Sequence, residues 1–345
     1  MKQIVTHLSG SKAYGTDTPE SDTDIRGIFC GEKKNILTPF YKIKQQTVED
    51  EEDTEYWELH HYMNNYVLKQ NPNMIETLWI DESDITQSHD AYWYLRENAE
   101  KLLSKKVAFT YSGYALAQLK KIKSHNKWIN NPQPVEPPKH KQFIKLVQNF
   151  TPKKIMPRNF TPDFLRGHSI VHYGGDIFGV LDGHEGGVKA FTDCGDFNIS
   201  AKQLSGSVEC SRPKYIIKYL KDEYLRAKDN HHNYWDWKKN RNPKRAALEE
   251  KYGYDCKNAL HTVRLLKQGE EILKGQGVIV KRPDAKELLD IRNGAWAYDD
   301  LIKWAEEKDK YIRNELYNTS KLPKTPNLQL AADVLMTAQE MIWDN

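Results

Sequence analysis

The residues of this sequence best suited to chemistry are two aspartates separated by a single residue. Asp22 and Asp24 lie at the start of a segment predicted to be a strand, since side-chain polarity alternates over residues 23–29 as it does in a half-buried strand. Because successive strand side chains point to opposite faces, the spacing of two predicts that both carboxylates share one face. Two such carboxylates repel each other unless a cation lies between them. Mg²⁺ is usually held by one or two carboxylates together with substrate phosphates, so the pair predicts a divalent metal site.

A short turn upstream of the aspartates offers a place for phosphate. The apolar, β-branched run at residues 4–8 predicts a buried strand, and Gly10 and Ser11 open a small turn directly after it. The backbone N–H groups of such a turn, where it opens onto a helix, are suited to binding phosphate. The sequence therefore predicts a triphosphate site close to the metal site.

These two features together resemble the signature of a known superfamily. The letters GS at positions 10 and 11, followed after ten residues by DTD, are similar to the motif of the DNA-polymerase-beta-like nucleotidyltransferases. The longer form GSxAYGTxTPxSDxDxRGIF is similar to the branch called the RNA-repair-pathway polymerase-beta family. The resemblance covers about residues 1–125 and 250–315. It implies metal-dependent transfer of a nucleoside monophosphate from a nucleoside triphosphate to a hydroxyl group, with release of pyrophosphate.

The resemblance also implies a third catalytic carboxylate, for which the sequence offers two residues. Asp53 lies at the end of an acidic run and fits the family spacing, with His61 at a position where the family tends to have Lys. Glu55 is the rival, because the period of the strand predicted for residues 54–59 puts it on the same face as Asp53. Most acidic runs of this kind are solvated loops, so a purely structural interpretation of the run is also open.

Cationic side chains suited to a triphosphate come from both ends of the chain. The stretch YGYDCKNALHTVRLLKQGEEILKG predicts a strong helix that ends at a glycine, and it resembles the family's GYDxKxxxHxxRLL helix. Lys257, His261 and Arg264 are spaced four and three residues apart and so line one face of this helix. With Lys12 and Arg26, they are the residues that the resemblance implies for binding the nucleotide and neutralising charge on the transferred group.

Two other segments allow either a structural or a functional interpretation. Residues 71–76 resemble the family's NPNxxE stretch, but Asn-Pro also simply ends one helix and starts another. Residues 235–245 are dense in Trp, Lys and Arg, which suits RNA phosphates and unstacked bases, although a solvated loop between helices has the same composition.

The chain divides most clearly at a proline-rich stretch, residues 130–138, which favours extended polyproline geometry. We expect a nucleotidyltransferase catalytic domain at residues 1–125, a linker and insertion at 126–250, and a helical domain completing the active site at 251–345. The predicted fold class is α/β or α+β: a small mixed nucleotidyltransferase sheet flanked by helices, a mainly helical C-terminal half and a small β-rich insertion.

Composition limits the partners. The 345 residues are 39% hydrophobic and 29% charged with a net charge of +3, so nucleic-acid contact must come from local patches. The four cysteines are scattered without a CxxC pair, which predicts a reduced, cytoplasmic compartment. No signal peptide or long apolar run occurs in this sequence, so we expect no membrane association.

The sequence as a whole predicts a nucleotidyltransferase that uses Mg²⁺ or Mn²⁺ and a nucleoside triphosphate such as ATP. We expect the metal ligands to be Asp22, Asp24 and Asp53 or Glu55. The expected acceptor is an RNA end, with transfer RNA as one possibility. The alternatives are an AMPylase-like protein nucleotidylyltransferase and an inactive RNA-binding module; the intact aspartates and Gly-Ser turn argue against inactivity.

Overall fold

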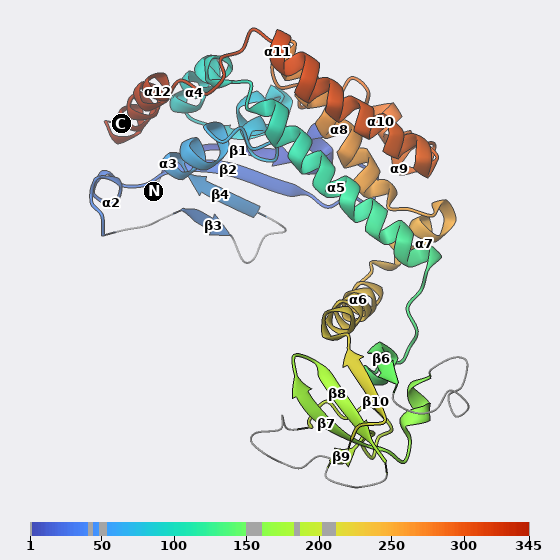
Figure 1. The fold of residues 1–345 in the computed structure, drawn as a ribbon. Coiled ribbons are helices and arrows are strands. Elements are labelled where there is room, and N and C mark those ends of the chain that lie inside the picture. Colours follow the sequence, from blue (N-terminus) through green and yellow to red (C-terminus); the bar gives the residue numbers. More distant parts are fainter. Residues whose placement is uncertain are drawn as a thin grey trace. The chain divides into compact units, whose positions relative to one another are not determined.

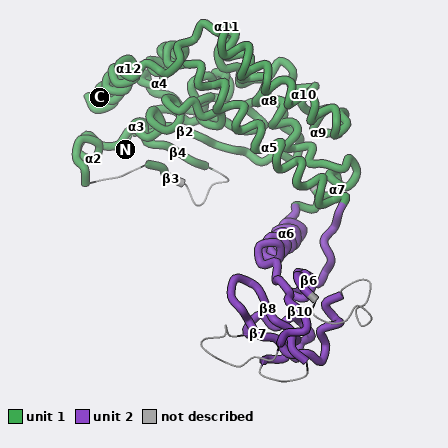
Figure 2. Tube along the Cα trace, viewed as in Figure 1, with its two compact units in different colours: residues 1–130, 242–345 green, residues 131–241 purple. Residues whose placement is uncertain are grey.

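The computed structural model describes residues 2–40, 44–47, 54–149, 161–182, 187–201 and 212–344. The chain forms two compact units (Figure 2). Unit 1 combines Met1–Asn130 with Asn242–Asn345, and unit 2 is Asn131–Arg241. The two ends of the chain, which the sequence assigns to separate domains, thus lie in one unit, and unit 2 is inserted between them.

Unit 1 contains a mixed sheet of five strands in the order β3-β4-β2-β1-β5 (Figure 1). Strands β2 and β4 run parallel, and the other neighbouring strands are antiparallel. The strands are β1 (Lys2–Ser9), β2 (Asp24–Cys30), β3 (Gln45–Thr47), β4 (Thr54–Glu58) and β5 (Ile85–Ser88). The predicted α+β class with a small mixed sheet is confirmed.

Helices make up most of the rest of unit 1. Its α-helices are α1 (Gly10–Tyr14), α2 (Lys33–Leu37), α3 (Leu59–Tyr62), α4 (Asp90–Ala99), α5 (Val107–Asn130), α7 (Pro243–Tyr252), α8 (Cys256–Leu273), α9 (Ala285–Arg292), α10 (Tyr298–Lys310), α11 (Tyr317–Thr319) and α12 (Leu328–Trp343). Short 3-10 turns, including Ile75–Trp79, and π-helical turns at Met63–Val67 and Tyr311–Leu316 lie between them.

Two apolar cores hold unit 1 together. One lies between β1, β2 and β4 on one side and α3, α4 and α12 on the other. The second lies around α5 and α8, which pack directly on each other. Since α5 comes from the N-terminal segment and α8 from the C-terminal segment, this second core joins the two ends of the chain into one folding unit.

Unit 2 has its own antiparallel sheet and its own core. Its strands are ordered β6-β10-β8-β7-β9, and α6 (Lys221–Lys239) follows β10. The strands are β6 (Ile144–Asn149), β7 (Ser169–Gly174), β8 (Ile177–Leu181), β9 (Val188–Lys189) and β10 (Tyr215–Tyr219). The predicted fold class includes a small β-rich insertion, and this unit provides it. None of the helices in the described part of the chain combines the length and apolar composition that crossing a bilayer requires.

Candidate active site

The carboxylate of Asp24 lies directly against Gly10. Strand β1 ends at Ser9, which pairs with Asp24 at the start of β2, and Gly10 then begins α1 with a φ of +63°. A Cβ added to Gly10 would lie 1.9 Å from Oδ2 of Asp24. Only a glycine tolerates both this backbone conformation and this close approach. The structure therefore brings the predicted phosphate turn and one predicted metal ligand into contact.

Asp22 lies just outside the strand. Strand β2 begins at Asp24 because its partner β1 turns into α1 after Ser9, so the expectation that both aspartates lie on one strand is corrected. Asp22 is exposed and Asp24 is half-buried. Between them, Thr23 accepts a hydrogen bond of 2.5 Å at Oγ1 from Nζ of Lys12 in α1. The motif segment is thus fastened to the predicted phosphate turn by a second contact.

Arg26 lies between two of the predicted catalytic carboxylates. Its Nη2 is 3.9 Å from Oδ1 of Asp24, and its Nε is 3.8 Å from Oε2 of Glu55. In the parallel pairing of β2 with β4, Arg26 lies opposite Glu55, and the strand period places Asp24 on the same face. A guanidinium between two carboxylates offsets their repulsion.

Only one of the two candidates for the third carboxylate can be placed. Glu55 lies on β4, and its side chain is about one-third exposed, at 31%. Asp53 immediately precedes Thr54 and lies outside the described residues. The carboxylates of Asp22, Asp24 and Glu55 are hard oxygen donors that solvent reaches, which is the ligand type that Mg²⁺ or Mn²⁺ requires. The residues present therefore fit a divalent ion.

His7 is a neighbour of this site that sequence analysis missed. It lies opposite Arg26 in the pairing of β1 with β2 and is 1% exposed. Its Nδ1 donates to the carbonyl of Leu8 at 2.7 Å, which leaves Nε2, 3.2 Å from Oγ1 of Thr77, as the acceptor in the neutral ring. Burial, assisted by the charge of Arg26, lowers the pKa of His7 to about 4. A single histidine in an apolar strand has no spacing pattern that could have revealed it.

The low pKa of His7 predicts a loss of stability in mild acid. The unfolded chain takes up a proton at its ordinary pKa of 6.5, whereas folded His7 stays neutral down to about pH 4. Stability is therefore complete above pH 6.5 and declines as the pH falls toward 4. Between pH 7.5 and 5 we expect His7 to account for about 2 kcal/mol of the decline in unfolding free energy.

Urea unfolding of the wild type and of His7→Gln at several pH values measures this contribution. The decline should be smaller by that amount in His7→Gln. Replacement of the exposed His60 by Gln is the control and should leave the pH profile unchanged. A decline of equal size in the wild type and in His7→Gln would contradict a neutral buried His7.

A buried cluster of three polar residues, Tyr14, Glu76 and Arg264, contacts the end of α1. The ring of Tyr14, the last residue of α1, lies 3.8 Å from the guanidinium of Arg264 on α8, and its hydroxyl donates to Glu76. Nη1 of Arg264 is 3.7 Å from Oε2 of Glu76, and each side chain is 5% exposed. Burial raises the pKa of Glu76 to about 7, although Arg264 and the Tyr14 hydroxyl act in the opposite direction. These three residues connect α1, α8 and the Ile75–Trp79 turn.

The three cationic residues predicted on α8 differ in how far they are exposed to solvent. Lys257 is exposed, His261 is half-buried and Arg264 is buried. Arg264 also donates from Nη1 to Gln268 at 2.9 Å, so its contacts are internal. A spacing of four and three residues predicts a shared helix face, but it carries no information on how deeply each turn of that face is covered. In this structure the Arg264 guanidinium packs on the ring of Tyr14 at the end of α1.

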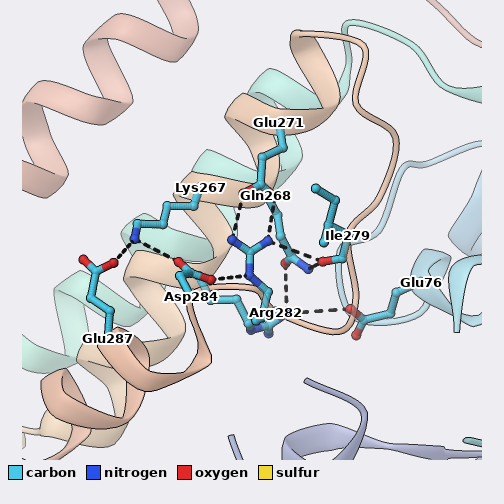
Figure 3. A network of polar contacts seen from close by, with 9 residues as sticks. Glu76, Lys267, Gln268, Glu271, Ile279, Arg282, Asp284 and Glu287 are labelled. Atoms are coloured by element: carbon cyan, nitrogen blue, oxygen red, sulfur yellow. Dashed lines mark hydrogen bonds and ion pairs between the residues drawn. The ribbon is translucent and has the colours of Figure 1, made fainter. Parts of the chain in front are cut away.

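A second buried cation also holds α1 in place. The backbone N–H of Arg282 donates to the carbonyl of Tyr14 at 3.0 Å. Figure 3 shows the Arg282 side chain between Glu271 and Asp284. It donates to both carboxylate oxygens of Glu271, at 2.6 and 2.7 Å, and to Asp284 at 2.8 Å. Lys267 binds the other oxygen of Asp284 at 2.8 Å. The C-terminal segment thus fixes the backbone at the end of α1.

The fold and this site define a class of protein. A small mixed sheet carries a Gly-Ser turn after its first strand and a DxD segment at the start of its second, which is the arrangement expected of a polymerase-beta-like nucleotidyltransferase. Residues 3–136 match the model of a family described as the RNA repair pathway DNA polymerase beta family. The resemblance that the sequence motif indicates is therefore confirmed. No curated protein and no solved structure matches the chain.

Proposed function

We propose that this protein transfers a nucleoside monophosphate from a nucleoside triphosphate to a hydroxyl group at an RNA end. The observation that supports the proposal best is the contact between Asp24 and Gly10. A cation bound by Asp24 would lie beside the turn that is suited to phosphate. Metal and triphosphate are the two groups that must meet for nucleotidyl transfer.

The roles of the side chains follow from their positions. Asp22 and Asp24, with Asp53 or Glu55, would hold Mg²⁺ or Mn²⁺, and the ion would lower the pKa of the incoming hydroxyl and stabilise the departing pyrophosphate. Backbone N–H groups at Gly10 and Ser11 would bind phosphate oxygens.

The cations would act at different distances from the triphosphate. Lys12, Arg26, Lys257 and His261 remain candidates for direct contact with it. Arg264 would act by positioning α1, since its guanidinium faces Tyr14 and Glu76.

The charge of unit 2 supports RNA as the acceptor. Residues 131–241 contain 18 Lys and Arg against 12 Asp and Glu, a net charge of +6, whereas the rest of the chain carries −3. Positive charge concentrated in one unit attracts the phosphate backbone of nucleic acids without regard to sequence. The description of the matched family, which names RNA repair, points to the same acceptor.

Around the C-terminal end of α6, we expect the basic side chains to contribute more to RNA binding than the Trp rings do. Lys238 lies 5.1 Å from the ring centroid of Trp235, and Arg241 lies 4.4 Å from that of Trp237. Nε1 of Trp235 also donates to the carbonyl of Pro134 at 3.0 Å. Since these rings already have partners within unit 2, we attribute RNA contact to the basic side chains of the unit and not to base stacking.

A labelling panel tests the proposal. Each of the four labelled nucleoside triphosphates is offered with Mg²⁺ to RNA, to DNA and to whole-cell protein, using the wild type and the Asp22→Ala/Asp24→Ala variant. We expect label in RNA with the wild type and none with the variant, whose thermal melt should stay close to that of the wild type because the two residues are not in the core. Label confined to a protein band would favour the protein nucleotidylyltransferase, and no label in any acceptor would favour the inactive RNA-binding module.

A further inference from the structure

Three potential metal ligands meet at the end of unit 1 where the chain passes to and from unit 2. His125 lies near the end of α5, Glu249 lies on α7, and Asp255 caps the N-terminus of α8. Nδ1 of His125 is 3.4 Å from Oε1 of Glu249 and also 3.4 Å from Oδ2 of Asp255. The three ligand atoms all lie within 4.8 Å of one another. They come from three helices and belong to none of the sites predicted from sequence.

The two carboxylates are deeply buried. Glu249 is 2% exposed and Asp255 is 0% exposed, whereas the His125 side chain keeps 17% of its surface in contact with solvent. A divalent ion bound by both carboxylates would offset the repulsion between them. Asp255 is held in a fixed orientation, because its oxygens accept from the backbone N–H of Asn258 at 3.0 Å and from its side-chain amide at 2.8 Å. Such support from a neighbouring group is typical of metal ligands.

The separations suit coordination better than direct hydrogen bonding. An N–H···O hydrogen bond is shortest and strongest near 2.9 Å, so both 3.4 Å distances are long for that interaction. Zinc bonds to nitrogen and oxygen are about 2.0–2.1 Å, and a tetrahedron with such bonds has ligand-to-ligand edges of about 3.4 Å. Imidazole with two carboxylates is also a donor set that zinc accepts readily, whereas magnesium prefers oxygen alone.

We propose that His125, Glu249 and Asp255 bind one zinc ion whose role is to fasten α5, α7 and α8 together. Water would be the fourth ligand, since the His125 side chain is 17% exposed. His125 lies five residues before Asn130, and Glu249 lies seven after Asn242, the two points at which the chain crosses between units. The ion would link the three helices of unit 1 close to these two points. Asp255 is nine residues from Arg264 on α8, about 13 Å along the helix, so this site is separate from the contact with Tyr14.

Metal binding by the untagged full chain tests this site without activity as a readout. After chelator treatment and dialysis, the wild type should bind one zinc per chain by elemental analysis. Its melting temperature should rise by about 5 °C at a hundredfold excess of zinc over Kd. Cobalt, used as a visible probe, should give the strong absorption of a tetrahedral site.

Matched variants locate the ion. His125→Gln and Glu249→Gln should each lose the zinc and the rise in melting temperature. Glu250→Gln, which removes the same charge from the neighbouring exposed position of α7, should keep both. Asp22→Asn/Asp24→Asn should also keep both. Wild-type protein that binds no zinc and shows no zinc-dependent rise would overturn the proposal, and so would zinc binding that persists in both His125→Gln and Glu249→Gln.

Discussion

Gly10→Ala should reduce nucleotide transfer by about a hundredfold or more, because displacement of a catalytic group by about 1 Å can cost that much. The added methyl would lie 1.9 Å from Oδ2 of Asp24, so either the carboxylate or the first turn of α1 must move. The φ of +63° adds the cost of a left-handed alanine, about 1–2 kcal/mol. The measurement is the rate of labelled nucleotide incorporation under saturating triphosphate, together with the melting temperature of the variant.

A glycine elsewhere in unit 1 provides the control for this substitution. Gly113 lies within α5, and a Cβ added there meets nothing within 4 Å. Gly113→Ala should therefore preserve the rate and raise helix stability by up to about 1 kcal/mol. If Gly10→Ala transferred nucleotide as fast as the wild type, the contact between Asp24 and the phosphate turn would have no part in catalysis, and the proposed function would lose its main support.

The second large effect is expected from Arg264→Met. This substitution leaves Glu76 buried without its guanidinium partner and removes the cation from the ring of Tyr14. Breaking a buried ion pair from one side costs about 3–5 kcal/mol, which corresponds to a melting temperature lower by about 6–20 °C in a unit of this size. Differential scanning calorimetry measures the change. The double variant Arg264→Met/Glu76→Gln should recover part of it, because no charge is then left unpaired.

Lys257→Met distinguishes between two roles of the cations on α8, positioning of α1 and direct binding of phosphate. Lys257 is on the same helix as Arg264 but is exposed, so its loss should change the melting temperature by about 1 °C or less and act instead on KM for the triphosphate. An Arg264→Met variant with an unchanged melting temperature and a raised KM would show the opposite of our expectation. Arg264 would then be the phosphate ligand that the motif resemblance implies.

Much of the candidate site follows from local sequence. A β-branched run, a Gly-Ser turn and a DxD segment lie within 30 residues, so strand period and turn chemistry were sufficient to predict a strand, a turn and a second strand in the right order. The same local rules predicted α8 and a β-rich insertion. These elements are formed mainly by contacts between residues close in sequence. The local pattern therefore contains the information that was needed to predict them.

The position of Asp22 is an example of what strand period cannot predict. The pairing partner of β2 stops at Ser9, so the strand starts at Asp24 and the expected shared strand is shorter by two residues. The strand period in this segment predicts alternation of side chains, but it does not predict where a partner strand turns away.

The sequence by itself indicated the family that residues 3–136 match, through the order and spacing of a few residues in its first 30 positions. Tertiary structure decided which cations reach the surface, as Arg264 is buried against Tyr14 while Lys257 is exposed. It also decided the pairing of Glu76 with Arg264, the burial of His7 and the meeting of His125 with Glu249 and Asp255. The physical reason is that periodicity along one helix or strand specifies the direction of a side chain. Its depth and its distant partners depend on which other segments pack against that face.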